Sequence, residues 1–251
     1  VKIMNSEIRH NSMSAIAIEN GYVEVMNNEI SDSGDGIYVT GDSQVTIKEN
    51  TLKSNLNGIF LTGNLTRVVD IRQNKVLLNN QSGIQLDMDA YASLTILYNT
   101  LSSNEKGFYV SGRAKAYITN NSIAYNKVGI FYQSGNATTP HEAHYNDIYG
   151  NDFGMNVLLQ ATVNAMYNYW GDSSGPYHVS LNPSGKGNQV GGDGINLDFI
   201  PFLTAPIGYI NERPTAELLT DKNLVPPNEP VTFIATTSSD DKRVDQYFFN
   251  F

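Results

Sequence analysis

Asparagine returns along this chain at intervals of 22 to 25 residues, and this repeat restricts the possible folds more than any other feature. When residues 1–168 are cut into units of this length, two columns of aligned asparagines and one column of glycines emerge. The first column is Ser6, Asn28, Asn50, Asn74, Asn99, Asn121, Asn146 and Asn168, the second is Asn11, Ser33, Asn55, Asn79, Asn104, Asn126 and Asn151, and the glycines are Gly36, Gly58, Gly83, Gly107, Gly129 and Gly154. Such a repeat is typical of a solenoid, in which each unit packs on its neighbours.

Apolar residues alternate with polar residues inside each unit. Examples are Ile37-Tyr-Val39 and Val45-Thr-Ile47, in which apolar residues stand two positions apart. This spacing is the period of a β-strand and not that of a helix. Three short strands per unit, each followed by a turn, predict the coils of a parallel β-helix, about seven to eight in number, in an all-β protein.

Identical side chains lie above one another in such a stack. The side-chain amide of an inward asparagine can then hydrogen-bond to the equivalent asparagines in neighbouring coils. It can also pair with the polar backbone groups of a turn within the core. The aligned glycines are expected at turns that need a positive φ.

Segments such as VTIKENTLKSNLNGIFL and AYITNNSIAYNKVGIFY resemble the right-handed parallel β-helix repeats of the NosD and carbohydrate-binding/sugar-hydrolysis (CASH) type. The segment from Asn168 to Leu203 is similar to the closing segment of many such helices in archaeal and bacterial envelope proteins. An irregular stretch rich in Trp, Pro and Gly can also cover the last strands of a solenoid. The resemblance implies a right-handed parallel β-helix over residues 1–206, closed by residues 168–206, in an extracellular or cell-surface protein.

The composition changes after Pro206, where the asparagine columns stop and prolines become frequent. Residues 207–251 are similar to the first half of a polycystic kidney disease (PKD) domain, an immunoglobulin-like sandwich. They offer fewer strands than the roughly seven that a sandwich needs. We therefore expect a linker and the N-terminal part of a truncated PKD-like domain. The chain begins at Val1 without a leader, as expected of a processed protein or an excised piece.

Charge and composition exclude several function classes. The chain has no cysteine, so it can form neither disulfides nor zinc–thiolate sites. Its net charge of −9 is the wrong sign for binding nucleic acid. The apolar stretch from Ile200 to Ile210 contains Pro201 and Pro206 and is too short to insert directly into a membrane.

Acids and bases gather where insertions lengthen the connection after the last strand of a coil. We expect Arg67, then Asp87 and Asp89, then Arg113 and Lys115, and finally His141 to stack along one edge of the solenoid. One interpretation is a surface ion ladder, which contributes little to stability. The other is an acid–base site for a sugar substrate, in which Asp87, Asp89, Arg113 and Lys115 are the candidate catalytic residues.

Metal ligands are not arranged in a familiar motif. The four histidines lack the spacing of a two-histidine metal site, so no cofactor is expected from them. Asp172, Asp193 and Asp198 lie among glycines in the closing segment and could hold calcium with loop carbonyl groups. Aspartates that only form turns are the alternative.

One column of aromatic residues points away from the predicted core. Its members are Tyr38, Phe60, Tyr109 and Phe131, with Gln85 and Asn156 at the intervening and following positions. Contiguous exposed rings commonly mark a contact surface. Alternatively, the rings only stack on one another, or a partner domain covers them.

These features favour an extracellular, S-layer-associated β-helix module for adhesion or glycan binding. The expected partners are a polysaccharide or glycoprotein glycan and the neighbouring domains of the parent protein. The alternative is a polysaccharide lyase or glycoside hydrolase, since a fold does not determine a function. Convergence of Asp87, Asp89 and one base in a groove would favour the enzyme, and scattered carboxylates would favour the binding module.

Overall fold

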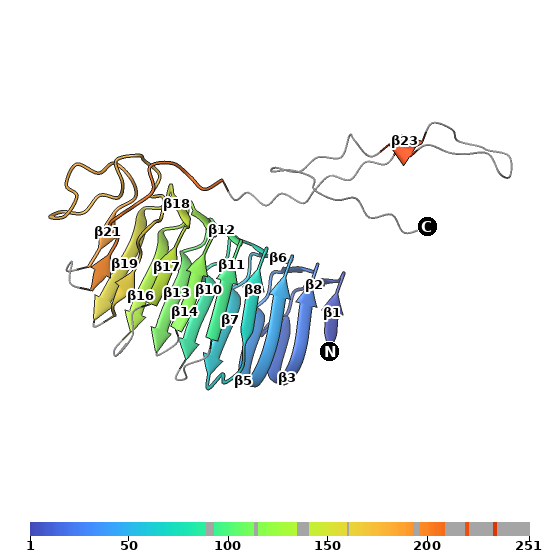
Figure 1. Ribbon diagram of the computed structural model, residues 1–251. Helices are drawn as coiled ribbons and strands as arrows, with labels where there is room; N and C mark the ends of the chain where they lie inside the picture. The colour runs from blue at the N-terminus through green and yellow to red at the C-terminus, as the bar shows by residue number, and fades with distance from the viewer. Residues whose placement is uncertain are drawn as a thin grey trace. The chain divides into compact units, whose positions relative to one another are not determined.

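The computed structural model describes residues 1–88, 93–112, 115–134, 141–159, 161–192, 196–208, 219–220 and 233–234 (Figure 1). The chain divides into two compact units, Val1–Tyr209 and Ile210–Phe251. The described residues form strands, turns and loops, which confirms the predicted all-β class. None of them belongs to a helix long and apolar enough to cross a membrane.

The first unit is a solenoid of stacked coils (Figure 1). A typical coil contains the strands β9 (Lys75–Leu77), β10 (Ser82–Met88) and β11 (Ser93–Leu97). Each of these strands pairs in parallel with its counterparts in the coils before and after it. The predicted parallel β-solenoid with three strands per coil is therefore confirmed.

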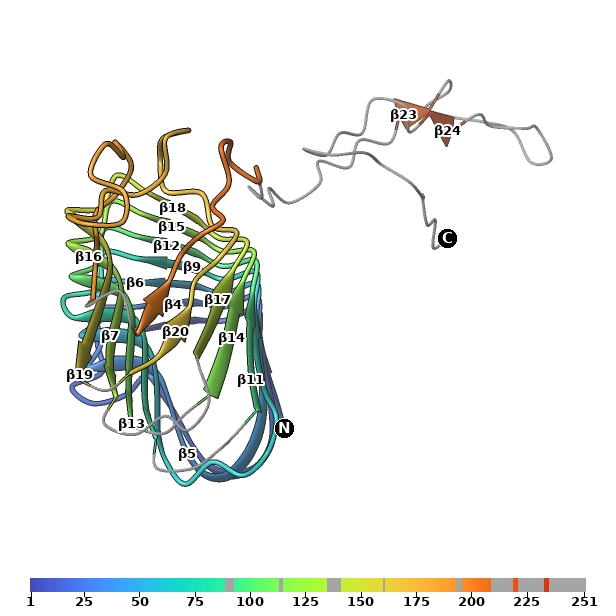
Figure 2. The same ribbon diagram turned by 60° about the vertical axis from the view of Figure 1, so that its left-hand side comes forward.

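A sheet of 15 strands wraps two faces of the solenoid (Figure 2). The front face consists of β7 (Asn57–Gly63), β10, β13 (Lys106–Gly112), β16 (Val128–Ser134), β19 (Phe153–Leu159) and β21 (Val190–Gly191). The back face consists of β8 (Val69–Arg72), β11, β14 (Lys115–Thr119), β17 (His141–His144), β20 (Val163–Asn164) and β22 (Leu197–Asp198). The long strand β5 (Asp35–Lys48) joins them, because its first half pairs with β7 and its second half with β8. Before it come β3 (Ile16–Met26) and β1 (Lys2–Met4).

A second sheet of seven short strands forms the narrow face. Its members are β2 (Glu7–Arg9), β4 (Glu29–Ser31), β6 (Thr51–Lys53), β9, β12 (Thr100–Ser102), β15 (Ser122–Ala124) and β18 (Asp147–Tyr149). These seven coil positions enclose about six turns, compared with the seven to eight coils predicted. A parallel bridge from Asp147 to Tyr169 continues the stacking one position further.

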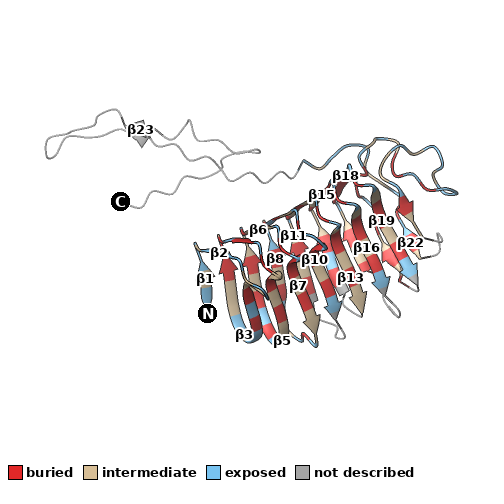
Figure 3. Cartoon of the chain, turned by 180° about the vertical axis from the view of Figure 1, so that it is seen from behind, coloured by how far each residue is buried: buried red, intermediate tan, exposed pale blue. Residues whose placement is uncertain are grey.

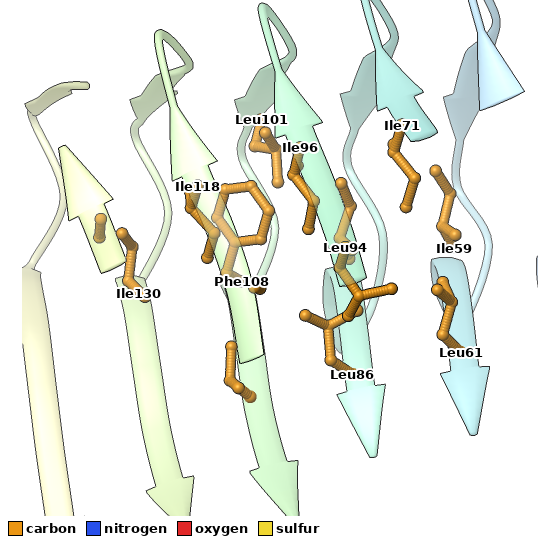
Figure 4. Packing of buried hydrophobic residues seen from close by; sticks show 14 of the residues in the cluster. Ile59, Leu61, Ile71, Leu86, Leu94, Ile96, Leu101, Phe108, Ile118 and Ile130 are labelled. Carbon is orange, nitrogen blue, oxygen red and sulfur yellow. The ribbon is translucent and has the colours of Figure 1, made fainter. Parts of the chain in front are cut away.

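Aliphatic side chains from all three faces fill the interior. Leu86, Leu94 and Leu101 come from three successive strands and are fully buried (Figure 4). Buried and partly exposed residues alternate along the front strands, as the burial colours show (Figure 3). The alternation read from the sequence is thus the alternation between core and solvent.

Both asparagine columns form buried hydrogen-bond ladders, as predicted. The backbone N–H of Asn74 donates to Oδ1 of Asn99 at 3.0 Å, and its Nδ2 donates to the same oxygen at 3.0 Å. Nδ2 also donates to the carbonyl oxygen of Ile47 at 2.9 Å, in the preceding coil. Oδ1 of Asn74 accepts the equivalent bonds from Asn50. Each amide therefore satisfies a polar turn that would otherwise be costly to bury.

The turns beside the ladders place residues other than glycine in the left-handed region. The residue immediately before a ladder position has a φ between 52° and 59° at Asn5, His10, Asn27, Asp32, Glu49, Ser54, Gln73, Leu78, Tyr98, Ser103, Asn120, Tyr125, Tyr145 and Tyr167. One residue in the left-handed conformation turns the chain, so that a new strand begins after it. The ladder asparagine then fixes the turn by bonding to the next coil.

The glycine column has a different cause from the one predicted. Gly36, Gly58, Gly83, Gly107, Gly129 and Gly154 are not among the residues with positive φ. A Cβ on Gly83 would lie 2.7 Å from the carbonyl oxygen of Gly107 and 3.1 Å from Nδ2 of Asn104. The column is glycine because successive coils approach closely there, and the predicted positive φ is wrong.

The segment after β20 closes the C-terminal end of the stack. Trp170 is fully buried, and β21 and β22 pair with β19 and β20. Oδ1 of Asn188 accepts the backbone N–H of Asn151 at 3.1 Å and its Nδ2 at 3.0 Å. Asn188 therefore continues the second ladder, although a loop separates it from Asn151 by 37 residues.

The chain leaves the solenoid over the last strand of the narrow face. The carboxylate of Asp147, which is 7% exposed, accepts the backbone N–H groups of Ile207 at 2.8 Å and Gly208 at 3.1 Å. Burial raises the pKa of Asp147, and these two hydrogen bonds oppose the rise.

Of the second unit, the structure describes the antiparallel pair β23 (Leu219–Thr220) and β24 (Phe233–Ile234). The predicted linker and PKD-like domain, residues 207–251, lie mostly outside the described residues. The PKD-like domain therefore stays a prediction.

Candidate functional site

The front face brings the outward aromatic residues together in one line, here called the ring column. It contains Tyr38, Phe60, Gln85, Tyr109, Phe131 and Asn156, which are register partners from β5 to β19. Each member is partly exposed, whereas Ile59 and Leu61 on either side of Phe60 are fully buried. The column therefore faces solvent along the solenoid axis.

The rings of this column pack in two pairs. The ring centroids of Tyr38 and Phe60 are 5.6 Å apart at an interplanar angle of 75°, and those of Tyr109 and Phe131 are 5.7 Å apart at 35°. Gln85 separates the two pairs. The self-stacking foreseen as one alternative thus occurs, while each ring keeps part of its surface exposed.

A second outward row runs beside the ring column, two residues further along each strand. This polar row consists of Thr62, Asp87, Ser111 and Gln133. Oγ of Ser111 donates to Oδ1 of Asp87 at 2.8 Å, and the hydroxyl of Tyr109 donates to Oε1 of Gln133 at 3.0 Å. The two rows place apolar ring surfaces next to hydroxyl, carboxylate and amide groups.

Asp87 was expected in an edge loop, and this position is wrong. It lies inside β10, next to Gln85 of the ring column, because the strand extends to Met88. Asp89 and Arg113 lie outside the described residues, and only the backbone of Lys115 is described. A catalytic grouping of Asp87, Asp89, Arg113 and Lys115 stays a prediction.

Arg67 pairs with the coil before it. Its Nε and Nη2 donate to the two carboxylate oxygens of Asp42 at 2.7 and 2.6 Å, and its Nη1 donates to the hydroxyl of Tyr22 at 2.7 Å. The hydrogen bonds from Arg67 to Asp42, with a further one from Thr66, lower the pKa of Asp42 to about 2. This part of the edge fits the ion-ladder interpretation.

His141 does not belong to the edge. It occupies an inward position of β17, paired with Val163, and is 2% exposed. Its ring packs on the buried ring of Tyr132, with centroids 4.9 Å apart. Burial raises the pKa of the Tyr132 hydroxyl, and the charge of Glu142 raises it further. The predicted place of His141 in the edge stack is therefore wrong, because an inward position of the coil accepts an aromatic ring.

The described calcium candidates bond to their own turns. The hydroxyl and backbone N–H of Ser174 donate to Oδ1 of Asp172 at 2.6 and 2.9 Å, and these bonds lower the pKa of Asp172. Asp198 is exposed beside Asn164 on the back face. Asp193 lies outside the described residues. The calcium site of Asp172, Asp193 and Asp198 stays a prediction.

Four exposed tyrosines on the later turns were not identified as candidate site residues from the sequence. We call Tyr98, Tyr125, Tyr145 and Tyr167 the turn tyrosines, and their exposed fractions are 37%, 63%, 47% and 39%. Each directly precedes a ladder asparagine and has a φ between 53° and 59°. The recurring Tyr-Asn dipeptide is the signal that identifies them.

A carboxylate–imidazole pair lies next to these tyrosines on the back face. Nε2 of His144 is 2.6 Å from Oε2 of Glu142, and Nδ1 of His144 is 2.9 Å from the carbonyl oxygen of Met166. A carbonyl oxygen can only accept, so Nδ1 carries a proton. Both ring nitrogens are engaged, which fixes the imidazole beside Tyr145.

The chain matches a known protein family. A family model described as "Periplasmic copper-binding protein (NosD)" matches residues 1–189, which include the coils of the solenoid. The chain belongs to the NosD family. Comparison with curated proteins and with solved structures finds no match. Membership of a family with a periplasmic description indicates that this NosD-family chain is an exported β-helix protein.

The family description names copper, and the described histidines and carboxylates do not form a copper-binding group. Protein-bound copper prefers imidazole, thiolate and thioether ligands, and the chain has no cysteine. Nδ1 of the buried His178 accepts the backbone N–H of Leu181 at 3.0 Å, while His141 is inside the core and both nitrogens of His144 are engaged. Within the described ranges, no three His, Asp or Glu side chains come together as a metal-binding group.

Proposed function

We propose that this NosD-family chain is an extracellular or cell-surface module that binds glycans and acts in adhesion. The observation that carries the proposal is the ring column beside the polar row on the front face. Sugars combine C–H faces, which pack on aromatic rings, with hydroxyl groups, which bond to carboxylate, amide and hydroxyl side chains. The ring column supplies the apolar contacts, and the polar row beside it supplies the hydrogen-bonding groups.

The dimensions of the column suit a chain-like ligand. Adjacent coils are about 4.8 Å apart, so the four coil steps from Tyr38 to Phe131 span about 19 Å. A polysaccharide lying along the solenoid axis would cross both ring pairs and the intervening Gln85. Each ring contributes on the order of 1 kcal/mol or less, so binding depends on several rings acting together.

Charge favours an uncharged glycan. The chain carries a net charge of −9, and Asp87 stands in the polar row. An anionic polymer would be repelled at low salt, where charges act over longer distances. We therefore expect neutral polysaccharides, or neutral parts of glycoprotein glycans, to be preferred.

The alternative is a polysaccharide lyase or glycoside hydrolase that uses the same face. Such an enzyme needs a second carboxylate or a base close to Asp87. Among the described residues, the carboxylate of Asp87 accepts a hydrogen bond from Ser111. None of the ion pairs between described residues contains Asp87. This arrangement supports binding more than catalysis.

The double variant Tyr109→Ala/Phe131→Ala tests the proposal. We expect wild type to be retarded in gels that contain neutral glucan or mannan, and less so with polygalacturonate, and the double variant to lose most of this retardation. Tyr117→Ala, which removes an exposed ring from the back face, is the matched control and should bind as wild type does.

The oligomeric state, measured by light scattering, separates the remaining explanations. Lost retention with an unchanged state supports a glycan platform. A changed state would mean that a second subunit or neighbouring domain covers the ring column. If neither property changes, the column is only self-stacked surface and the proposal is wrong.

A further inference from the structure

Tyrosine is an unusual choice for the left-handed turn of the later coils. In the earlier coils the turn before the first ladder holds Asn5, Asn27, Glu49 and Gln73, so it accepts several residue types at positive φ. A bulky residue at positive φ is an outlier. Conformational strain of this kind tends to persist where it serves a function. The turn itself therefore does not explain why Tyr98, Tyr145 and Tyr167 stand there.

These three tyrosines belong to one column along the solenoid. The backbone N–H of Tyr98 donates to the carbonyl oxygen of Asn120 at 3.1 Å, Asn120 to Tyr145 at 2.9 Å, and Tyr145 to Tyr167 at 3.1 Å. The rings of Tyr145 and Tyr167 are stacked, with centroids 5.5 Å apart and an interplanar angle of 11°. Both remain exposed to solvent. The column thus presents a preformed aromatic surface.

Asn120 interrupts the tyrosines at one position. Tyr98 and Tyr145 are two coil steps apart, about 9.6 Å, and Asn120 stands between them with a partly exposed side chain. The amide of Asn120 therefore lies next to the exposed ring of Tyr145 along the column. Hydrogen-bonding groups lie close by, since Thr119 of β14 is the register partner of His144, whose ring is held by Glu142.

We propose that the column of Tyr98, Asn120, Tyr145 and Tyr167 is a second carbohydrate site, which holds a single neutral sugar unit against the tyrosine rings. The C–H face of the sugar packs on Tyr145, and the amide of Asn120 bonds to its hydroxyl groups. The acids Glu142 and Asp147 lie nearby, and the chain is acidic overall, so an uncharged sugar is favoured over an acidic one.

This site is distinct from the ring column. Tyr145 lies at the turn between β17 of the back face and β18 of the narrow face, whereas the ring column lies on the front face (Figure 2). The two sites do not share a residue. A glycan could therefore be contacted on two sides of the solenoid, and each contact can be removed without the other.

Tyr145→Asn in the full chain tests the second site. Asparagine already occupies this turn at Asn5, Asn27 and Asn120, so the backbone is preserved. The matched control is Tyr125→Asn, which removes a ring with a φ of 56° and 63% exposure from the other turn column. Both variants relieve the same strain.

The binding measurement uses the Tyr109→Ala/Phe131→Ala background, so that the ring column does not contribute. Saturation-transfer NMR with neutral hexasaccharides of glucose and of mannose should show residual binding, which Tyr145→Asn weakens about fivefold and Tyr125→Asn leaves unchanged. The melting temperature of Tyr145→Asn should be equal to or higher than that of its background.

Three results would overturn the second site. One is the absence of residual binding in the background variant, and another is an equal loss of binding in both asparagine variants. The third is a lower melting temperature of Tyr145→Asn with unchanged binding, which would show a purely structural stack. None of these results bears on the ring column, whose own test compares wild type with the double alanine variant.

Discussion

At the scale of the residue, the ladder asparagines decide how a coil can turn inside an apolar core. Asparagine is short enough to bond to the backbone N–H of its equivalent in the neighbouring coil, and its Nδ2 reaches the carbonyl groups left by the turn. Leucine of similar size would fill the space but leave these groups unpaired. Leaving a buried polar group unpaired costs more free energy than one hydrogen bond contributes.

Asn74→Leu should therefore lower the free energy of unfolding by roughly 1 to 3 kcal/mol. The substitution removes the acceptor of the Asn50 N–H and the donor to the carbonyl oxygen of Ile47. Chemical unfolding of wild type and variant measures the difference. Thr46→Ala, an outward and partly exposed position, should change stability little. Equal behaviour of the two variants would contradict the ladder.

Asp147 should make stability depend on pH. Its pKa is raised by burial, and a carboxyl group whose pKa is higher in the folded state contributes stability below its unfolded pKa, which is lost as the pH rises through the folded pKa. Asp147→Asn keeps an oxygen acceptor for the N–H groups of Ile207 and Gly208 and does not ionise.

We expect the stability of wild type to fall relative to Asp147→Asn as the pH rises from about 3 to about 7. Urea unfolding at several pH values gives the difference between the two proteins. A difference that is constant with pH, or that increasingly favours wild type, would show that Asp147 does not act in this way.

At the scale of the element, the glycine column sets how closely successive coils approach one another where each front strand begins. A Cβ on Gly83 would clash with the backbone oxygen of Gly107, and rotating a side chain cannot relieve this clash. The same close contact recurs from Gly36 to Gly129. The column therefore fixes the path of each coil between its second ladder and its front strand.

Gly83→Ala should destabilise the solenoid by about 1 to 3 kcal/mol, because two backbones would have to move apart. Thermal and chemical unfolding both measure the effect. Thr62→Ala, on the outward surface of the adjacent front strand, is the control and should be nearly neutral. A stable Gly83→Ala would mean that the coils can separate at little cost.

The elements were predictable wherever the repeat is regular. The ladders, the alternating strands and the outward ring column all follow from period and spacing, because one coil dictates the pattern of the next. Asn188 was missed, since the loop after Trp170 breaks the spacing of the second ladder. The glycines were placed correctly but misinterpreted, because positive φ and close contact both select glycine and leave the same mark in a sequence.

Individual site residues were harder to place. The end of β10 could not be located from alternation alone, so Asp87 was assigned to a loop. His141 was assigned to the edge because it was counted as part of a lengthened connection, but it begins β17 and its ring packs inward on Tyr132. The turn tyrosines were visible as Tyr-Asn dipeptides, but their meaning depends on the backbone conformation.

At the scale of the whole molecule, the solenoid turns a short repeat into long parallel rows of side chains. Aromatic and polar rows on one face suit a ligand that repeats along the same axis. Membership of a family described as periplasmic indicates an exported protein. Stability comes from the ladders and core, so the outward rows can vary without loss of the fold.

Binding without catalysis is expected at Asp87. Wild type incubated with neutral or anionic polysaccharide should release neither new reducing ends nor unsaturated uronates. Asp87→Asn should leave the melting temperature nearly unchanged, because an exposed carboxylate contributes little to stability. Product release by wild type that disappears in Asp87→Asn would establish the enzyme and refute the binding module.

We propose that a face spanning several coils, rather than a single pocket, binds the glycan. The most direct test is calorimetric affinity for neutral oligosaccharides of increasing length, from two to eight sugar units. Affinity should rise with length until the ligand spans the distance of about 19 Å from Tyr38 to Phe131, and then level off. A disaccharide that binds as tightly as the longest ligand would contradict the account, and so would the absence of binding at every length.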